Sequence, residues 1–259
     1  MNNLLEKKPE NLIKYGDMFE MNGHYLVNGD ATDLSIINKI LNNVKISAII
    51  SDPPYAIDYV ASKANFQNVS KPKDILTDHF QTDTEYSEFT YKWLSLALPF
   101  MNTPNSIYIF NSDKMIFALR DGMIQAGVKL SQLLIWVKNN SVVGRLDYCP
   151  KHELIAYGWY GSHRFRKSKD QSVLFFPKTN RSTLHPTMKP ISLMRHLILN
   201  SSNINDVIYD PFGGSGSTLL AAEQTKRKCV MIELDPEYCQ VIIERWEKLT
   251  GLRVKKIYG

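Results

Sequence analysis

Short runs of apolar and β-branched residues alternate along this chain with segments whose apolar residues recur at helical spacing. The runs predict buried strands, and the periodic segments predict amphipathic helices. We expect strands near residues 25–28, 47–51, 106–110, 133–138, 153–157, 207–210 and 229–233, and helices over residues 34–41, 84–98, 115–126, 191–200, 217–225 and 236–250. The alternation predicts an α/β fold, in which a doubly wound, mostly parallel sheet of seven strands has helices on both faces.

Two segments interrupt the alternation. Residues 56–83 form a long polar stretch between a strand and the next helix, and residues 141–180 contain only one expected strand. Loops of such length in compact domains usually have a function. We expect the 259 residues to fold as one domain, with 56–83 as a mobile loop and 141–180 as an insertion.

The composition is that of an ordinary globular protein, with 44% hydrophobic and 22% charged residues. The three cysteines are odd in number and widely spaced, so we expect neither a disulfide framework nor a metal site. The first residues lack the apolar core of a signal peptide, and no apolar run is long enough to span a bilayer. These features favour a cytoplasmic protein that has no membrane partner.

The tetrapeptide Asp52-Pro53-Pro54-Tyr55 directly follows an expected strand, and the carboxyl ends of strands are where open α/β sheets bind ligands. Two successive prolines make a stiff turn. The Asp52 carboxylate and the Pro53 carbonyl, beside the Tyr55 ring, suit a planar group that has an amino substituent. The alternative is an ordinary β-turn, in which Asp52 caps the turn and Tyr55 packs.

The segment from Asp210 to Thr218 joins a strand to a helix through a loop that contains three glycines. Glycines at such a place let a ligand approach the backbone and leave helix amides free. The spacing lacks the third glycine of a dinucleotide fingerprint and the lysine of a phosphate loop, so neither NAD nor ATP is favoured. Glu233 ends the next strand and can accept from ribose hydroxyls. The glycine loop and Glu233 together indicate an adenosine site. The alternatives are that the loop is only a tight turn and that Glu233 only caps the next helix.

In these motifs the chain resembles the S-adenosylmethionine-dependent DNA amino-methyltransferases, which act on adenine N6 or cytosine N4. Asp52 to Tyr55 resembles their catalytic motif, and Asp210 to Thr218 resembles their cofactor loop. Residues 185–190 resemble the segment that holds the methionine end of the cofactor, and residues 28–30 resemble the motif whose acid reaches its adenine. The motif order resembles the circularly permuted β subgroup, which implies a Rossmann-like fold with a target-recognition segment within the insertion.

The resemblance implies a set of cofactor-binding residues. They are Asp30, Thr187, Lys189, Asp210, Phe212, Gly214, Gly216, Thr218 and Glu233. Two of them have alternatives. Phe212 could belong to the core, and Lys189 could pair with a phosphate or with solvent.

The resemblance also implies the reaction, a direct methyl transfer to the N6 amino group of an adenine flipped out of duplex DNA. Asp52 and the Pro53 carbonyl would accept hydrogen bonds from the amino group, Tyr55 would stack on the base, and Pro54 would stiffen the turn. Neither a covalent intermediate nor a metal is expected. Aspartate at position 52 favours adenine. The alternatives are cytosine-N4 methylation and, in a different class, a non-catalytic DNA-binding module that retains the fold.

Basic residues gather in one part of the insertion, although the net charge of +5 is mild. They are His163, Arg164, Arg166, Lys167 and Lys169. Such a cluster suits DNA phosphates, and the alternative is a solvated loop. Double-stranded DNA is the expected partner; a homodimer and a cognate restriction enzyme are further partners that the resemblance leaves open.

Overall fold

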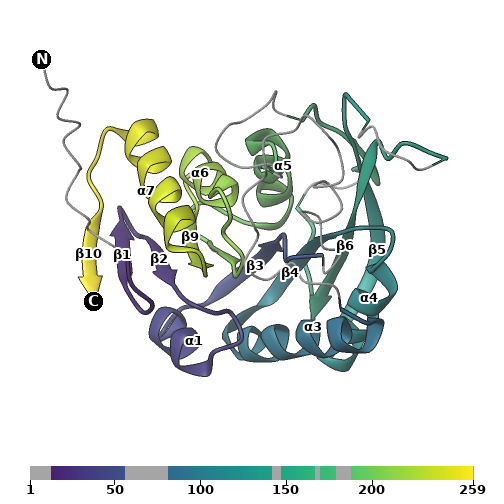
Figure 1. Ribbon diagram of the computed structural model, residues 1–259, viewed down its shortest axis with the longest axis horizontal. Helices are drawn as coiled ribbons and strands as arrows, with labels where there is room; N and C mark the ends of the chain where they lie inside the picture. Colours follow the sequence, from purple (N-terminus) through teal and green to yellow (C-terminus); the bar gives the residue numbers. More distant parts are fainter. Residues whose placement is uncertain (1–12, 56–80, 142–146, 167–169, 179–187, 259) are drawn as a thin grey trace, which may run out of the picture.

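A computed structural model describes residues 13–55, 81–141, 147–166, 170–178 and 188–258, and it contains one sheet with helices on both faces (Figure 1). The described strands are β1 (Met18–Met21), β2 (His24–Asn28), β3 (Ile46–Ser51), β4 (Met101–Asn111), β5 (Val128–Val137), β6 (His152–Tyr160), β7 (Val173–Phe175), β8 (Val207–Asp210), β9 (Lys228–Glu233) and β10 (Lys255–Tyr258). The described helices are α1 (Leu34–Leu41), α3 (Asp83–Ala97), the short 3-10 helix η1 (Leu98–Phe100), α4 (Ile116–Gln125), α5 (Ile191–Ser201), α6 (Ser217–Gln224) and α7 (Pro236–Thr250).

The described strands form one ten-stranded sheet in the order β10-β1-β2-β9-β8-β3-β4-β6-β5-β7. Its central strands, from β2 to β4 in that order, all run parallel. Strand β6 runs antiparallel between β4 and β5. This arrangement confirms the predicted α/β fold with a mostly parallel sheet. The predicted count of seven strands is wrong, because the sheet has three further strands.

The three strands missing from the sequence prediction lie at or next to the two edges of the sheet. β7 has three residues and β1 has four, too few to show a period. All four residues of β10 are exposed, so this strand has no alternation of apolar and polar positions. It is held instead by antiparallel pairing with β1 and by an ion pair of 2.7 Å between Lys256 and Asp17.

The helices form two layers. Helices α5, α6 and α7 cover one face of the sheet, and α1, α3 and α4 cover the other (Figure 1). Each layer packs on its own buried cluster, which includes Leu197 and Trp246 on the first face and Ile37 and Trp93 on the second. Burial of these apolar surfaces is the main force that holds the layers to the sheet.

The bounds of α1 and α7 agree with the prediction because local signals mark their ends. The Asp235 side chain accepts from the Glu237 amide at 2.8 Å and so caps α7, and Pro236 occupies its first turn. The helix ends at Gly251, whose φ of 73° suits glycine. None of the described helices is long and apolar enough to cross a membrane.

The strands that precede the sequence motifs all end on the same side of the sheet, which runs across the strand ends and not along the outer strands β10 and β7. Parallel strands β2, β9, β8 and β3 all end there, and Asn28 of β2 pairs with Glu233 of β9. Because β6 is antiparallel to β4, it begins at this same edge, which we call the carboxyl edge. The strand pairing therefore brings Asp52, Asp210 and Glu233 to one side of the molecule, although the chain separates them widely.

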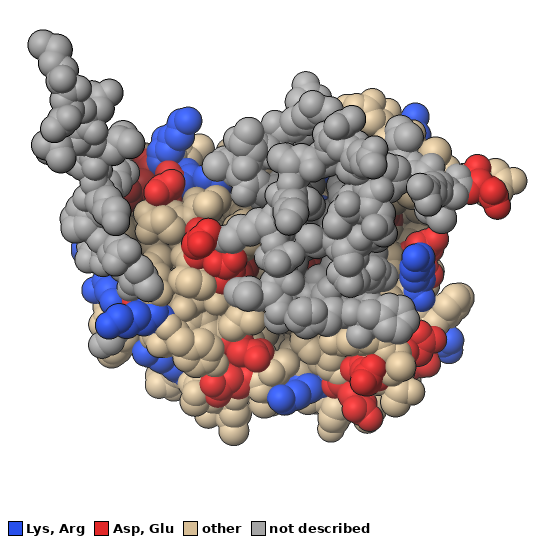
Figure 2. Space-filling view, in the orientation of Figure 1, with Lys and Arg blue, Asp and Glu red and all other residues tan. Residues whose placement is uncertain are grey.

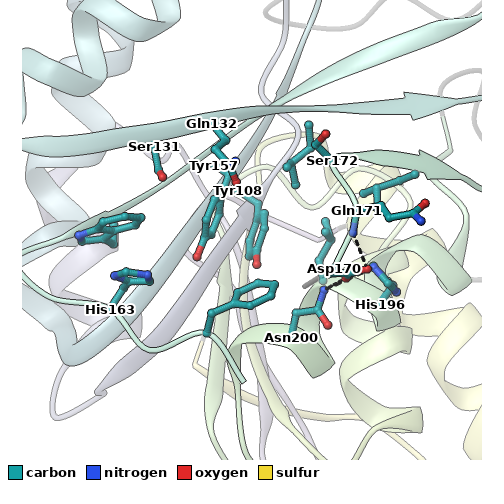
Figure 3. Close-up of a pocket in the computed structure, with 15 residues that line it drawn as sticks. Tyr108, Ser131, Gln132, Tyr157, His163, Asp170, Gln171, Ser172, His196 and Asn200 are labelled. Atoms are coloured by element: carbon teal, nitrogen blue, oxygen red, sulfur yellow. Dashed lines mark hydrogen bonds and ion pairs between the residues drawn. The ribbon is translucent and has the colours of Figure 1, made fainter. Parts of the chain in front are cut away.

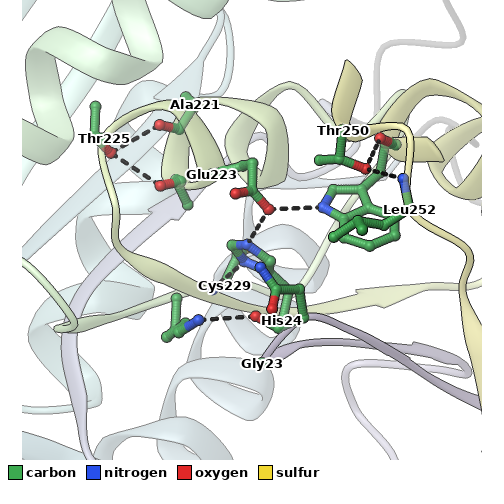
Figure 4. Close-up of polar contacts among 12 residues, drawn as sticks. Gly23, His24, Ala221, Glu223, Thr225, Cys229, Thr250 and Leu252 are labelled. Carbon is green, nitrogen blue, oxygen red and sulfur yellow. Dashed lines mark hydrogen bonds and ion pairs between the residues drawn. The ribbon is translucent and has the colours of Figure 1, made fainter. Parts of the chain in front are cut away.

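A buried histidine ties β2 to the helices above it (Figure 4). His24 Nδ1 accepts the Cys229 amide at 2.9 Å, and its Nε2 lies 3.0 Å from Glu223 Oε2. The same carboxylate oxygen accepts from the indole of Trp246 at 2.9 Å. Since Nδ1 accepts a hydrogen bond, the proton of the neutral ring is on Nε2, which donates to Glu223. Burial lowers the pKa of His24, and Glu223 only partly opposes this.

This histidine is expected to make the protein less stable in mild acid. Its pKa is lower in the folded state than in the unfolded chain, where it is about 6.5. As the pH falls below that value, the unfolded chain binds the proton first, so His24 contributes less to the free energy of unfolding. Urea unfolding of wild type and His24→Asn tests this, because Asn keeps an acceptor for Cys229 but does not titrate. The stability difference between the two should shrink from pH 7.5 to about pH 5.5; a constant difference would contradict the prediction.

Candidate active site

The turn after β3 holds the acceptor groups predicted from the sequence. Asp52 and Tyr55 leave this turn on the same side, and Asp52 Oδ1 accepts from the Tyr55 hydroxyl at 2.8 Å. Pro53 is buried and Pro54 is partly exposed, so the turn is anchored on one side. The structure thus places a carboxylate, a rigid turn and an aromatic ring together at the carboxyl edge.

Lys189 joins this turn to the glycine loop. It precedes α5 and is only 5% exposed. Its carbonyl accepts from the Ser217 hydroxyl of α6 at 2.9 Å, and its ammonium donates to Asp52 Oδ2. The sequence analysis assigned Lys189 to the cofactor. In the structure its charged end lies on Asp52, and its contact with the cofactor stays a prediction.

Two charged residues of the site were missed by the sequence analysis. Glu153, at the start of β6, accepts from Lys138 through Oε1 at 2.6 Å and from Lys189 through Oε2 at 3.2 Å. The same Oε2 lies 3.2 Å from the Tyr55 hydroxyl. The available signal was a carboxylate at the start of a largely apolar strand, since charges in such strands are rare unless they are paired.

The buried charges shift one another's pKa. Burial, together with the negative charge of Glu153, raises the pKa of Asp52 against the opposing effect of Lys189. Burial also opposes ionisation of Glu153, but Lys189 and Lys138 outweigh it and lower the pKa of Glu153 to about 2. Burial and Asp52 raise the pKa of Tyr55, so its hydroxyl keeps its proton. Of the two carboxylates, Asp52 is therefore the one that takes up a proton more easily.

The glycine loop follows β8 as predicted. Asp210 is 3% exposed, and burial raises its pKa to about 8 although a hydrogen bond with Thr218 opposes this. Gly216 has a φ of 79°, and an added Cβ would lie 3.0 Å from Ile242. A side chain at this position would be strained in both respects. The backbone conformation of the loop thus depends on glycine.

Glu233 ends β9 and Asp30 follows the adjacent strand β2, both beside this loop. Glu233 accepts from the Gly214 amide at 2.6 Å and from the Asp235 amide at 2.8 Å, and burial raises its pKa to about 7. Because Asp235 caps α7, Glu233 is not that cap. Asp30 Oδ1 accepts from the amide and hydroxyl of Thr32, at 2.7 and 2.9 Å.

Phe212 contacts the core, which was the alternative for this residue. Its ring centroid lies 5.6 Å from that of Trp93 and 5.7 Å from that of Phe89. The residue is nevertheless partly exposed. Packing therefore accounts for one part of the ring, and a contact between the exposed part and the cofactor stays a prediction.

The described residues of the basic cluster, His163, Arg164 and Arg166, lie away from Asp52. Strand β6 runs from Glu153 at the carboxyl edge to Tyr160 at the opposite edge, where the Asn105 amide donates to the Ser162 carbonyl at 3.2 Å. His163 then stacks on Trp159 with 3.6 Å between ring centroids. The Arg166 amide donates to the Asn200 carbonyl near the end of α5. The structure does not bring His163, Arg164 or Arg166 to the catalytic turn.

A separate cavity of about 350 Å³ lies beside this cluster, between the sheet and α5 (Figure 3). Tyr108 and Tyr157 line it from the sheet, and His163 lines it from the loop after β6. His196 and Asn200 of α5 also border it, and neither Asp52 nor the glycine loop does. This cavity is therefore not part of the candidate active site.

Several predicted features fall outside the described residues. They are Thr187, Lys167, Lys169 and nearly all of the polar stretch 56–83. On the face shown in Figure 2, described acidic and basic residues are interspersed, with no broad patch of one sign among them. The charges of the described residues in this view therefore do not identify a DNA-binding face.

The sequence pattern of the DNA methylase family matches residues 46–244, a range that includes the turn at Asp52 and the glycine loop. The chain belongs to the DNA methylase family. It is 26% identical over 260 residues to "Type II methyltransferase M2.DpnII" of Streptococcus pneumoniae, across 92% of this chain and 97% of that relative.

Solved structures support the same assignment. The complex of M1.HpyAVI with S-adenosylmethionine matches at a TM-score of 0.63 and 26% identity, across 85% of this chain and 98% of that one. The cytosine-N4-specific PvuII DNA methyltransferase matches at a TM-score of 0.68 and 16% identity, across 92% and 94% of the two chains, which shows a common fold. The protein is a DNA methyltransferase that uses S-adenosylmethionine.

The loop region suits this cofactor. Among the described residues, no Lys, Arg or His forms an ion pair with Asp210 or Glu233. Asp210 is buried and Glu233 is partly exposed, both have raised pKa values, and hydroxyl or ammonium donors of a ligand would stabilise their ionised forms. Gly214 and Gly216 have positive φ values of 52° and 79°, a backbone conformation that exposes loop and helix amides to a ligand at the start of α6 more readily than residues with side chains would.

Proposed function

We propose that the protein methylates the N6 amino group of adenine in double-stranded DNA. The supporting observation is the position of the Asp52 carboxylate beside the Tyr55 hydroxyl, at the end of β3. Strand β3 pairs in parallel with β8, which leads into the glycine loop. Acceptors for an amino group and a ring that can stack on a base thus lie next to the proposed cofactor loop.

The catalytic roles follow from this placement. Asp52 and the Pro53 carbonyl accept the two amino hydrogens, and Tyr55 stacks on a base that has left the duplex. These hydrogen bonds favour a pyramidal nitrogen whose lone pair is free to attack. When bound, S-adenosylmethionine supplies an electrophilic methyl group. The amino nitrogen loses one proton on methylation, and Asp52 is the nearest proposed acceptor for it.

The proposed cofactor site surrounds the glycine loop. Glu233 accepts from the ribose hydroxyls, Asp30 binds the adenine, and the segment with Lys189 holds the methionine end. The remaining members of the proposed site are Thr187, Asp210, Phe212, Gly214, Gly216 and Thr218. Asp30 and Glu233 follow adjacent paired strands, a separation that one nucleoside can span.

Cytosine-N4 methylation is the second candidate. The fold does not separate the two, since a cytosine-N4-specific enzyme has a similar fold. Aspartate at position 52 supports adenine, because the cytosine-N4 enzymes that the chain resembles more often have serine there. Homodimer formation and a cognate restriction enzyme remain predictions.

Product analysis tests the proposal. Labelled S-adenosylmethionine is incubated with the protein and unmethylated duplex DNA of mixed sequence, and the nucleosides are then separated. We expect N6-methyladenine, and none in matched DNA that lacks adenine. N4-methylcytosine would overturn the choice of base. DNA binding without any methyl transfer, by folded protein that binds the cofactor, would favour the non-catalytic module.

Cofactor affinity is expected to fall as the pH is lowered from about 8.5 to about 6. The pKa values of Asp210 and Glu233 are about 8 and about 7, and both groups are stronger acceptors when ionised than when protonated. Below each pKa, a proton competes with the cofactor, by about tenfold for each pH unit. Calorimetric titration at several pH values measures the effect. The variant Glu233→Gln should flatten the profile near pH 7, and a pH-independent affinity of the wild type would contradict the assignment.

Contact of the basic cluster with DNA has its own test. If Arg164 and Arg166 bind phosphates, replacing both by Ala should reduce the slope of log K against log salt by about 0.9 for each lost contact. The duplex would then have to extend past the carboxyl edge and over the α5 side of the protein. An unchanged slope would assign the cluster to a solvated loop, and Lys114→Ala, on the loop before α4, serves as the matched control.

A further inference from the structure

The acceptor that the proposed reaction needs is already engaged. Asp52 Oδ1 accepts from the Tyr55 hydroxyl, and Asp52 Oδ2 accepts from the Lys189 ammonium. Lys189 is buried, so its ammonium has little contact with water. Leaving a buried charge without a partner is strongly unfavourable. A target amino group that binds Asp52 competes with these two donors for the same carboxylate oxygens, and a second acceptor within reach of the donors would relieve that competition.

Glu153 is within reach of both donors. Its Oε2 lies 3.2 Å from the Lys189 ammonium and 3.2 Å from the Tyr55 hydroxyl. A phenol has one proton, which can turn about the C–O bond from Asp52 to Glu153 while the oxygen stays in place. An ammonium has three protons and can contact both carboxylates at once. Only small movements are needed to transfer both hydrogen bonds to Glu153.

The position of Glu153 is itself fixed. Its Oε1 accepts from Lys138 at 2.6 Å, and the residue pairs across the sheet with Trp136 of β5. Lys138 and Lys189 balance the charges of Asp52 and Glu153, so these four side chains are neutral in sum. A flipped base is neutral as well, so the exchange of hydrogen bonds changes no net charge in a buried place.

We propose that Glu153 is a positioning residue for methyl transfer, which accepts the Tyr55 hydroxyl and the Lys189 ammonium when the target amino group takes their place at Asp52. The residue acts through Tyr55 and Lys189 and does not contact the base. The inference rests on the proposed function in one respect, that the target amino group binds Asp52.

The first test is Glu153→Gln, which keeps the shape of the side chain and removes its charge. We expect kcat to fall about tenfold or more, because the donors then stay on Asp52 and the base is misplaced. Cofactor affinity should not change, since Glu153 has no contact with the glycine loop among its described hydrogen bonds. An unchanged kcat would overturn the proposal.

The pH profile separates positioning from a purely structural role. Among the described residues, the charged groups that face Asp52 are Lys189 and Glu153, with Asp210 near enough to interact. Lys138, Lys189 and Tyr55 face Glu153. Loss of the Glu153 charge lowers the pKa of Asp52, so the acid limb of kcat should move to lower pH. A carboxyl carbon NMR titration of Asp52 in the free protein measures the same shift, and equal pKa values in both proteins would overturn the proposal.

A double variant guards against simple charge imbalance. Glu153→Gln combined with Lys138→Met keeps Asp52, residue 153, Lys189 and residue 138 neutral in sum, but it replaces the second carboxylate by an amide oxygen, a weaker acceptor. We expect its kcat to stay low; recovery to the wild-type kcat would show that Glu153 only balances Lys138. Rates are measured on whichever base the wild type methylates, so an N4-methylcytosine product would overturn the choice of adenine and leave this test intact. The NMR titration needs no DNA, so equal pKa values would overturn the proposal even where no transfer is seen.

Discussion

Replacing Asp52 by Ala is expected to lower the rate of methyl transfer about 10²- to 10³-fold. The variant removes the carboxylate that we propose accepts from the target amino group, and it leaves Lys189 to pair with Glu153 alone. Cofactor affinity should stay near the wild-type value, because the proposed cofactor carboxylates are on other strands. Single-turnover transfer of labelled methyl measures the rate, and calorimetry measures the affinity.

Asp52→Asn is the matched comparison for this variant. Asn keeps one acceptor oxygen and the side-chain volume, so it should retain more activity than Ala at every pH. It also lacks a titrating carboxyl, so any acid limb due to Asp52 should disappear. If Ala and wild type had equal rates, Asp52 would not be the acceptor that we propose.

Replacing Trp246 by Ala is expected to reduce the free energy of unfolding by about 3–5 kcal/mol. The side chain is fully buried in α7, where it packs in the cluster beneath α5, α6 and α7. Its loss leaves a cavity and removes the indole donor of Glu223, which also pairs with His24. Urea unfolding followed by circular dichroism gives the free-energy difference.

Trp246→Phe separates packing from hydrogen bonding. Phe fills most of the space but donates no hydrogen bond to Glu223, so this variant should lower the free energy of unfolding by only about 1 kcal/mol. If Trp246→Ala lowered the free energy of unfolding by less than about 1 kcal/mol with an unchanged denaturant slope, the layer of α5, α6 and α7 would have to repack around the cavity. That result would also mean that the link from β2 through Glu223 to α7 matters less than its burial implies.

Local signals account for what the sequence predicted well. The ends of α7 follow from Asp235, Pro236 and Gly251, each of which acts within one turn of the helix. The turn at Asp52 and the loop before α6 each follow a strand, so their place at a carboxyl edge follows from the fold class. Family membership and the cofactor also agreed with the motifs.

Long-range pairing accounts for what the sequence did not show. Glu153 meets Lys138 because β6 pairs antiparallel with β5, and it meets Lys189 because α5 begins at the same edge. No spacing in the chain encodes either contact. The same pairing carries the chain after β6 to the edge opposite Asp52, so Arg164 lies far from the catalytic turn.

The sheet order has a consequence for the synthesis of this protein. Strands β8 and β9 fill the middle of the sheet between β2 and β3, yet the ribosome makes them after all the other strands except β10. Until then the nascent chain has two partial sheets, and the facing edges of β2 and β3 are open to aggregation. The proposed cofactor residues Asp210 and Glu233 arrive with these last strands. If these residues bind the cofactor as proposed, we expect methyl transfer only once translation of β8 and β9 is complete.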